Sequence, residues 1–252
     1  MQLFILCGSS SEIAKSYFTT LKKQISRGHI VTISRNKFNA NFDETSNNEI
    51  SHQHFTTDYS EQSLGEIAKE LAKELANSQY DLSQLMIFNG LLHDPANAPE
   101  RKLEQISEQH FINSMHTNAL LPIRCVTLFS TLLKPQVATV ICALSARVGS
   151  ISDNNLGGWY SYRASKAALN MLFKSAAIEL SRRYKQCHCV LFHPGTTDTP
   201  LSKPFQANVP EGKLFTPEFV AEQLYSLISD ADYLEQSHNP AYFDWQGKPI
   251  EW

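Results

Sequence analysis

The chain has 252 residues, of which 42% are hydrophobic, enough for one well-buried domain and short for two. Its formal net charge of -3 at pH 7 gives no electrostatic attraction to nucleic acid or to an anionic membrane. No apolar run reaches the ~20 residues that a membrane-spanning helix needs. The five cysteines, an odd number without a Cys-x-x-Cys pair, indicate reduced thiols and a cytoplasmic protein.

A short apolar run at residues 3–6 predicts a first strand that is buried on both faces. The turn after it contains Gly8, and three serines follow: Ser9, Ser10 and Ser11. Ser9 and Glu12 have the spacing of a capping box, which by itself is enough to begin a helix. A helix start with hydroxyl donors also suits a phosphate group, so a plain cap and a phosphate-binding turn are both open, and they are compatible.

Three further strands are predicted at residues 29–34, 54–57 and 82–88. The polar stretch at residues 36–51 is expected to be a surface loop. Arg35, after the first of these strands, offers a guanidinium fork that suits a phosphate, and a solvated loop cation is the plain alternative. The three strands end in polar residues or glycine: Ser34 and Arg35, then Asp58, then Asn89 and Gly90.

A long helical segment is predicted over residues 107–133, with Pro122 in its middle. Proline has no N–H, so the carbonyl of Asn118, four residues earlier, loses its helical donor. A kink between two helices is the plain interpretation of this pattern, and a freed carbonyl is compatible with it.

Tyr162 and Lys166 lie four residues apart at the start of an Ala-rich helix predicted over residues 162–184, so both project from one face. A phenol titrates near ~10, and a nearby ammonium together with a helix N-terminus lowers that pKa. Gly157 and Gly158 let the chain turn into such a terminus. The pair is therefore a candidate general acid/base, able to give a proton to a carbonyl oxygen. About half a Tyr-x-x-x-Lys match is expected by chance, so the surroundings must support it.

The same helix is apolar over more than one face, which predicts a second buried face and a homodimer. Trp159 and Tyr160, just before Tyr162, line either the substrate site or the core. A fifth strand is predicted at residues 137–144 and runs into Ser145.

A sixth strand is predicted at residues 189–193, and a last strand within residues 241–252. Residues 200–215 contain three prolines and are expected to form a mobile loop over the substrate. The turn after the sixth strand contains Pro194, Gly195, Thr197 and Thr199.

Taken together, these residues resemble those of the short-chain dehydrogenase/reductase family, in particular its C-factor-like and small carbonyl reductase members. The resemblance spans essentially the whole chain and follows the family's order and nearly its spacing. It implies one NAD(P)-binding domain over residues 1–252, a doubly wound Rossmann-type α/β fold with a parallel sheet of about seven strands between helices. The residues that carry it are Gly8, Asn89-Gly90, Asn118, Ser145, Tyr162-x-x-x-Lys166 and Pro194-Gly195-x-x-x-Thr199.

The resemblance also implies an oxidoreductase that transfers a hydride between NADP(H) and a carbonyl or alcohol. Tyr162 would be the general acid/base, and Lys166 would lower its pKa and bind the ribose. Ser145 would polarise the carbonyl, with Ser150 as the reserve, and the Asn118 carbonyl would hold a water of the proton relay. The cofactor-binding residues would be Gly8, Ser10, Ser11, Ile13, Ser34, Arg35, Asp58, Asn89, Gly90, Tyr162, Lys166, Pro194, Gly195, Thr197 and Thr199.

Ser34 and Arg35 stand where an NAD-preferring site places a carboxylate, so NADP(H) is expected rather than NAD(H). Three departures from the family pattern favour an alternative, a low-activity nucleotide-sensing or signalling protein on the same fold. Glu12 replaces a glycine, the turn at Asn89 is one residue short, and Ala146 stands at the place of the catalytic serine.

No metal site is expected, because His93-Asp94 and His52-x-His54 have no further ligands at useful spacing. The expected partners are a small carbonyl or alcohol substrate and a second copy of the chain, with no nucleic acid and no membrane.

Overall fold

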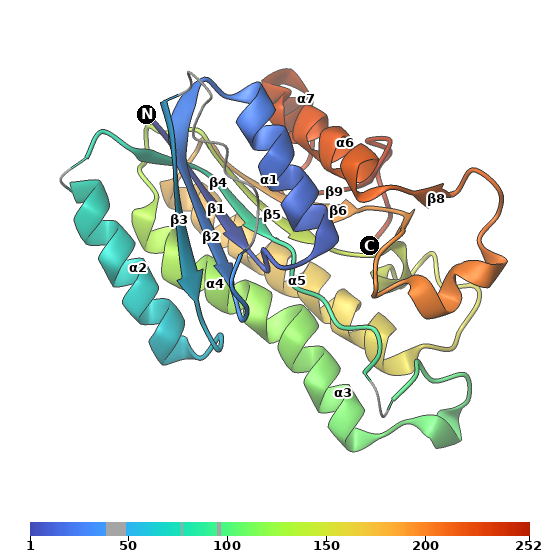
Figure 1. The fold of residues 1–252 in the computed structure, drawn as a ribbon. Helices are drawn as coiled ribbons and strands as arrows, with labels where there is room; N and C mark the ends of the chain where they lie inside the picture. Colours follow the sequence, from blue (N-terminus) through green and yellow to red (C-terminus); the bar gives the residue numbers. More distant parts are fainter. Residues whose placement is uncertain (39–48, 77, 95–96) are drawn as a thin grey trace.

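The computed structural model describes residues 1–38, 49–76, 78–94 and 97–252. A seven-stranded sheet lies at its centre in the order β3-β2-β1-β4-β5-β6-β9, with every neighbouring pair parallel (Figure 1). This confirms the doubly wound Rossmann-type sheet predicted from the sequence. The strands are β1 (Gln2–Cys7), β2 (Arg27–Ser34), β3 (Glu49–Thr56), β4 (Asp81–Ile87), β5 (Thr139–Leu144), β6 (Cys187–His193) and β9 (Ala241–Asp244).

Helices cover both faces of this sheet (Figure 1). The N-terminal strand shows why both faces need cover: Leu3 and Ile5 are buried in one core, whereas Phe4 and Leu6 are buried in the other. α2, α4 and α5 contribute to the first core, and α1 and α6 contribute to the second. The helices are α1 (Glu12–Gln24), α2 (Glu61–Ala76), α3 (Glu108–Met115), α4 (Leu121–Phe129), α5 (Tyr160–Arg183), α6 (Pro217–Ser229) and α7 (Ala231–Gln236).

Two short strands, β7 (Thr196–Thr197) and β8 (Leu214–Phe215), form a separate parallel pair. They bracket most of the predicted substrate loop, residues 200–215, which contains a 3-10 helix at Lys203–Asn208. The pair fixes both ends of this loop beside the carboxyl end of β6.

The start of β3 differs more from the sequence prediction than the other boundaries, which differ by one or two residues. β3 begins at Glu49, inside the stretch 36–51 that was expected to be a surface loop. Residues 39–48 of that stretch lie outside the described residues. β3 is an edge strand and none of its residues is fully buried, so it lacks the apolar run that reveals a central strand.

Candidate active site

The turn between β1 and α1 is built around Gly8, whose φ is +77°. A Cβ at this position would lie 2.7 Å from the backbone nitrogen of Asn89, so only glycine fits. The Gly8 N–H donates to the Tyr59 hydroxyl at 2.7 Å, and that hydroxyl donates to the carbonyl of Ile33 at 2.8 Å. Tyr59 therefore supports the turn, a role that no pattern in the sequence indicates.

α1 starts differently from the predicted capping box. Its N-cap is Ser11, whose hydroxyl accepts from the N–H of Ala14 at 3.2 Å, and the Glu12 carboxylate pairs with Lys15 at 2.8 Å. Ser9 does not cap the helix: its buried hydroxyl has no hydrogen-bond partner among the described residues. Of the predicted contacts, Ser10 is exposed and Ile13 belongs to the core. Ser9, which the predicted set omits, is thus the serine available to a ligand.

The ends of β2 and β3 lie at the same edge of the sheet. Ser34 is buried and donates its hydroxyl to the Asn36 carbonyl at 2.6 Å, whereas Arg35 is exposed. Asp58 is also exposed, and its carboxylate accepts from the N–H of Ser60 at 2.8 Å, which lowers the pKa of Asp58. Asp58 is therefore occupied at the start of α2, while Arg35 remains available to a phosphate.

Asn118 joins the turn after β4 to α5. Its amide exchanges two hydrogen bonds with the backbone of Leu91, both at 2.7 Å, and donates to the Ser165 hydroxyl at 2.9 Å. Ser165 in turn donates to the carbonyl of Tyr162 at 2.8 Å. The Asn118 side chain thereby fixes the helix that carries the candidate acid/base, in addition to the main-chain role expected from the sequence.

The interruption predicted at Pro122 is a π-helical turn, His116–Leu120, between α3 and α4. The N–H of Leu121 donates to the His116 carbonyl, five residues earlier. Pro122 has no N–H to give to Asn118. Such π turns occur often at functional sites, where they re-aim backbone groups.

Tyr162 and Lys166 are both buried on α5, and the Lys166 Nζ lies 5.9 Å from the Tyr162 ring centroid. Nζ donates to the carbonyl of Leu144 at 2.8 Å, and burial lowers the pKa of Lys166 to about 7. Burial also raises the pKa of Tyr162, and the neighbouring Tyr242 adds to the increase. The expected lowering of the tyrosine pKa is therefore wrong for this structure, because desolvation outweighs the attraction of a lysine that is itself only partly charged at neutral pH.

The Ser145 hydroxyl, expected to polarise the substrate carbonyl, already has a partner in this structure. Its buried hydroxyl donates to Asn170 Oδ1 at 2.6 Å, and Ala146 packs in the cluster with Tyr162 instead. Side chains alternate between the two sides of an extended strand, so the neighbours Ser145 and Ala146 point in opposite directions. The reserve, Ser150, accepts from the N–H of Asp153 at 3.1 Å, which leaves its own O–H as a donor.

The turn after β6 requires its glycine. Gly195 has φ +71°, and a Cβ there would lie 2.7 Å from the Phe215 ring. Thr197 Oγ1 is buried without a partner among the described residues, and Thr199 donates weakly to the Thr197 carbonyl at 3.4 Å. Burial lowers the pKa of His193, just before this turn, to about 4.

A cluster of apolar and aromatic residues surrounds Tyr162, and we call it the aromatic cluster. The Trp159 ring lies 6.2 Å from that of Tyr162, and the Phe205 ring lies 5.4 Å from that of Trp159. Phe205 comes from the substrate loop, so the loop already packs against the candidate acid/base. Tyr160 is not among the cluster's members, which are Leu92, Ala146, Val148, Trp159, Tyr162, Leu201 and Phe205.

Glu100 caps the start of α5 from a distant part of the chain. Its carbonyl accepts from the N–H of Trp159 at 2.5 Å, and its carboxylate accepts from the N–H and the hydroxyl of Ser161. Trp159 itself has φ +53° and makes no side-chain cap. No pattern in the sequence indicates this contact, because Glu100 and Ser161 are 61 residues apart.

These residues fit a dinucleotide at the carboxyl edge of the sheet. The polar atoms there that are buried without a partner among the described residues include Ser9 Oγ, Asn89 Oδ1 and Thr197 Oγ1. Buried polar atoms are normally paired, so these are poised for a bound ligand. The glycine turns at Gly8 and Gly195 bring backbone to the same edge. Gly90, by contrast, is exposed.

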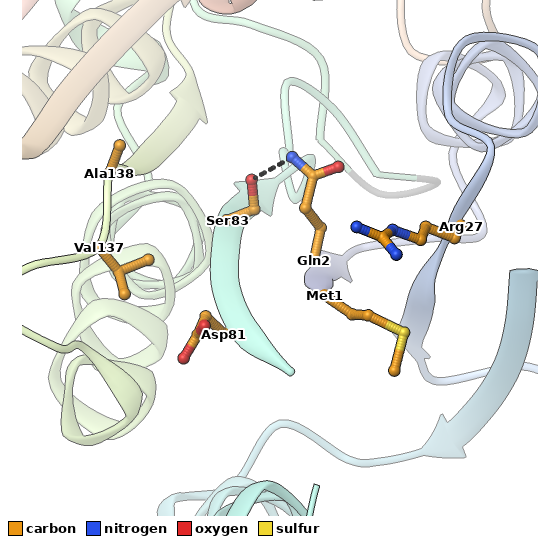
Figure 2. Close-up of a pocket in the computed structure, with 7 residues that line it drawn as sticks. All are labelled: Met1, Gln2, Arg27, Asp81, Ser83, Val137 and Ala138. Atoms are coloured by element: carbon orange, nitrogen blue, oxygen red, sulfur yellow. Dashed lines mark hydrogen bonds between the residues drawn. The ribbon is translucent and has the colours of Figure 1, made fainter. Parts of the chain in front are cut away.

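A separate pocket of about 380 Å³ lies at the opposite, amino end of the sheet (Figure 2). Its walls include Gln2, Arg27 and Ser83, and Gln2 donates to Ser83 at 3.3 Å. None of the candidate site residues lines it, and ligands of doubly wound folds bind at the other end of the strands.

Within the part of the chain that the structure describes, no helix is long and apolar enough to cross a membrane. The same residues contain no group of three or more histidine, cysteine or acidic side chains placed to hold a metal ion.

Residues 2–210 match the model of the short chain dehydrogenase family. The C-signal protein of Myxococcus xanthus is 33% identical over 135 residues, which cover 54% of this chain and 74% of that protein. A benzil reductase ((S)-benzoin forming) of Bacillus cereus is 29% identical over 154 residues, covering 54% of this chain and 59% of that enzyme.

Solved structures share the fold over the full length. The carbonyl reductase Sniffer of D. melanogaster superposes with a TM-score of 0.81 at 20% identity, and both chains are covered completely. An NADPH-bound carbonyl reductase from chicken fatty liver superposes with a TM-score of 0.74 at 18% identity, again with complete coverage of both chains.

Proposed function

The chain belongs to the short chain dehydrogenase family, and from that premise we propose that it is an NADP(H)-dependent carbonyl reductase. The observation that carries the proposal is the burial of Tyr162 and Lys166 on one face of α5, at the edge where Ser9, Asn89 and Thr197 present unpartnered polar atoms. The NADPH bound by the carbonyl reductase of similar fold supports the choice of cofactor.

In the proposed reaction, bound NADPH supplies the hydride that adds to the carbonyl carbon. Tyr162 donates its phenolic proton to the carbonyl oxygen, so a C–H and an O–H bond form while the C=O double bond becomes single. The raised pKa of Tyr162 keeps the phenol protonated and ready for this step in the reductive direction. Lys166, held by the Leu144 carbonyl, binds the ribose and returns a proton to Tyr162 through the water held at Asn118.

The other residues of the site bind and orient. Gly8, Ser9 and the start of α1 take the pyrophosphate, and Arg35 takes the 2′-phosphate. Gly195 and Thr197 take the carboxamide end of the nicotinamide. Leu201 and Phe205 exclude water from the substrate.

Titration with NADPH and NADH, followed by nicotinamide fluorescence, tests this proposal. We expect NADPH to bind about tenfold or more tightly than NADH, because the 2′-phosphate gains charge-assisted hydrogen bonds. Arg35→Ala should remove this preference, and the neighbouring exposed Lys37→Ala is the matched control. A panel of aromatic and aliphatic carbonyls should then show NADPH oxidation. Failure of both nucleotides to bind would contradict the proposal.

A second candidate is a nucleotide-sensing protein with little turnover. Ala146, which lacks a hydroxyl, packs in the cluster with Tyr162, while the Ser145 hydroxyl donates to Asn170. A missing polarising donor costs roughly 10²–10³ in rate by analogy with an oxyanion hole. NADPH binding without oxidation by any carbonyl in the panel is the result that favours this candidate.

We also infer a homodimer formed through α5. Met171 and Ile178 on this helix are 64% and 49% exposed, which is high for apolar side chains. Sedimentation at micromolar concentration should give twice the monomer mass, and a monomer would contradict this inference.

A further inference from the structure

His93 follows Leu92, a buried member of the aromatic cluster. Its ring packs edge-to-face on Phe205, with centroids 5.6 Å apart. Phe205 contacts Trp159, and Trp159 contacts Tyr162, at 5.4 and 6.2 Å. The rings of His93, Phe205, Trp159 and Tyr162 are thus linked by successive contacts around the candidate acid/base.

The Nε2 atom of His93 is buried and has no hydrogen-bond partner among the residues that the structure describes. An imidazole nitrogen buried without a partner is costly, so it is a candidate for contact with a bound ligand. The unpartnered atoms of Ser9, Asn89 and Thr197 lie on the turns that suit a nucleotide. His93 lies instead against Phe205 of the substrate loop, so the substrate is the ligand that suits it.

We propose that His93 Nε2 donates a hydrogen bond to a second oxygen of the substrate, one that is not reduced. The inference rests on the proposed carbonyl reductase function. Trp159 and Phe205 provide faces and edges for an aromatic ring, while Leu92 and Leu201 provide apolar contact. The substrate class is therefore an aromatic ketone with a further oxygen near the reacting carbonyl, as in a vicinal diketone.

The chemistry of the imidazole sets what the second oxygen must be. A neutral ring carries one donor and one acceptor nitrogen, and the tautomer with the proton on Nε2 donates to a carbonyl or hydroxyl oxygen. A site built to hydrogen-bond such an oxygen discriminates against an analogue that lacks it, because the buried donor is then left unpaired. His93 would thus set specificity without taking part in the proton transfer by Tyr162.

Benzil and deoxybenzoin form a matched substrate pair, because they differ by one carbonyl oxygen. We expect His93→Leu to lower kcat/KM for benzil about tenfold and for deoxybenzoin less than about threefold. His93→Asn, which keeps a donor, should recover part of the loss. The NADPH dissociation constant should stay unchanged in both variants. Equal losses with the two ketones would overturn the proposal while leaving the reductase function intact.

A second measurement does not depend on turnover. In protein labelled with ¹⁵N-histidine, benzil should shift the His93 Nε2 resonance, which is assigned by its absence in His93→Leu. Benzil binding is followed in parallel by tryptophan fluorescence. A shift without NADPH oxidation would refute the proposed function but support the contact. Benzil binding without a shift, or no benzil binding at all, would overturn the contact.

Discussion

Lys166 lies in the interior of the protein with its amino group, and the residue is only 3% exposed. Its Nζ donates a hydrogen bond to the Leu144 carbonyl, and burial lowers its pKa from 10.5 to about 7. Between these two values the unfolded chain binds a proton that the folded protein does not. The buried, neutral Lys166 therefore costs no folding stability above pH 10.5. The free energy of unfolding decreases as the pH falls from 10.5 to about 7.

Lys166→Met should show this effect as a difference from the wild type. The methionine does not titrate, so the free energy of unfolding of the variant should rise relative to that of the wild type as the pH falls from about 10 to about 7. The difference should grow by about 1.4 kcal/mol per pH unit and level off below about pH 7. Urea unfolding at several pH values measures it. Lys185→Met, at an exposed position, is the control. A wild-type-to-variant difference that does not change with pH would contradict the assigned burial.

Single residues could be predicted where the chemistry or the backbone turn requires one residue type at a fixed place in the sequence. The Tyr162 and Lys166 pair and the turn glycines Gly8 and Gly195 belong to this class, and each lies at the carboxyl edge of the sheet. The expectation that Ser145 polarises the carbonyl stays a prediction, and the hydrogen bond of its hydroxyl to Asn170 Oδ1 competes with that role.

At the scale of elements, the start of α5 depends on a residue outside the helix. Trp159 cannot cap it through its side chain, and the Glu100 carboxylate accepts both donors of Ser161. Glu100 is 2% exposed, so removing it leaves buried donors unpaired. Tyr162 is the next residue along the helix, so its position depends on this contact.

Glu100→Ala should lower the free energy of unfolding by about 1–3 kcal/mol, because the N–H and hydroxyl of Ser161 lose their acceptor. It should also lower kcat more than it weakens NADPH binding. Denaturant unfolding and steady-state kinetics measure the two effects, with the exposed Glu104→Ala as control. Ser161→Ala should cost less in the Glu100→Ala background than alone, and strictly additive losses would argue against the contact.

Helices and strands could be predicted where their sequence pattern is typical of only one structural environment. The central strands are apolar runs because both of their faces are buried, and Pro122 marked the irregular turn by its missing N–H. β3 was misplaced because an edge strand shares its polar composition with a loop. The Glu100 contact follows from tertiary packing, for which local sequence carries no signal.

At the scale of the whole molecule, the alternation of strands and helices was sufficient to predict the sheet. Parallel pairing then places the ends of β1, β2, β4 and β6 at one edge, and this is why residues far apart in the chain form one site. Which serine hydroxyls are already paired, and which buried polar atoms lack a partner among the described residues, depend on side-chain directions that topology does not specify.

The central claim is that Tyr162 transfers the proton in an NADPH-dependent carbonyl reduction. Tyr162→Phe removes only the hydroxyl, so the variant should bind NADPH within about twofold of the wild type and lose about 10²–10⁴ in kcat/KM for an aromatic ketone. Stopped-flow oxidation of bound NADPH, read by the loss of its fluorescence, measures this loss. A variant that oxidises NADPH at the wild-type rate would contradict the account.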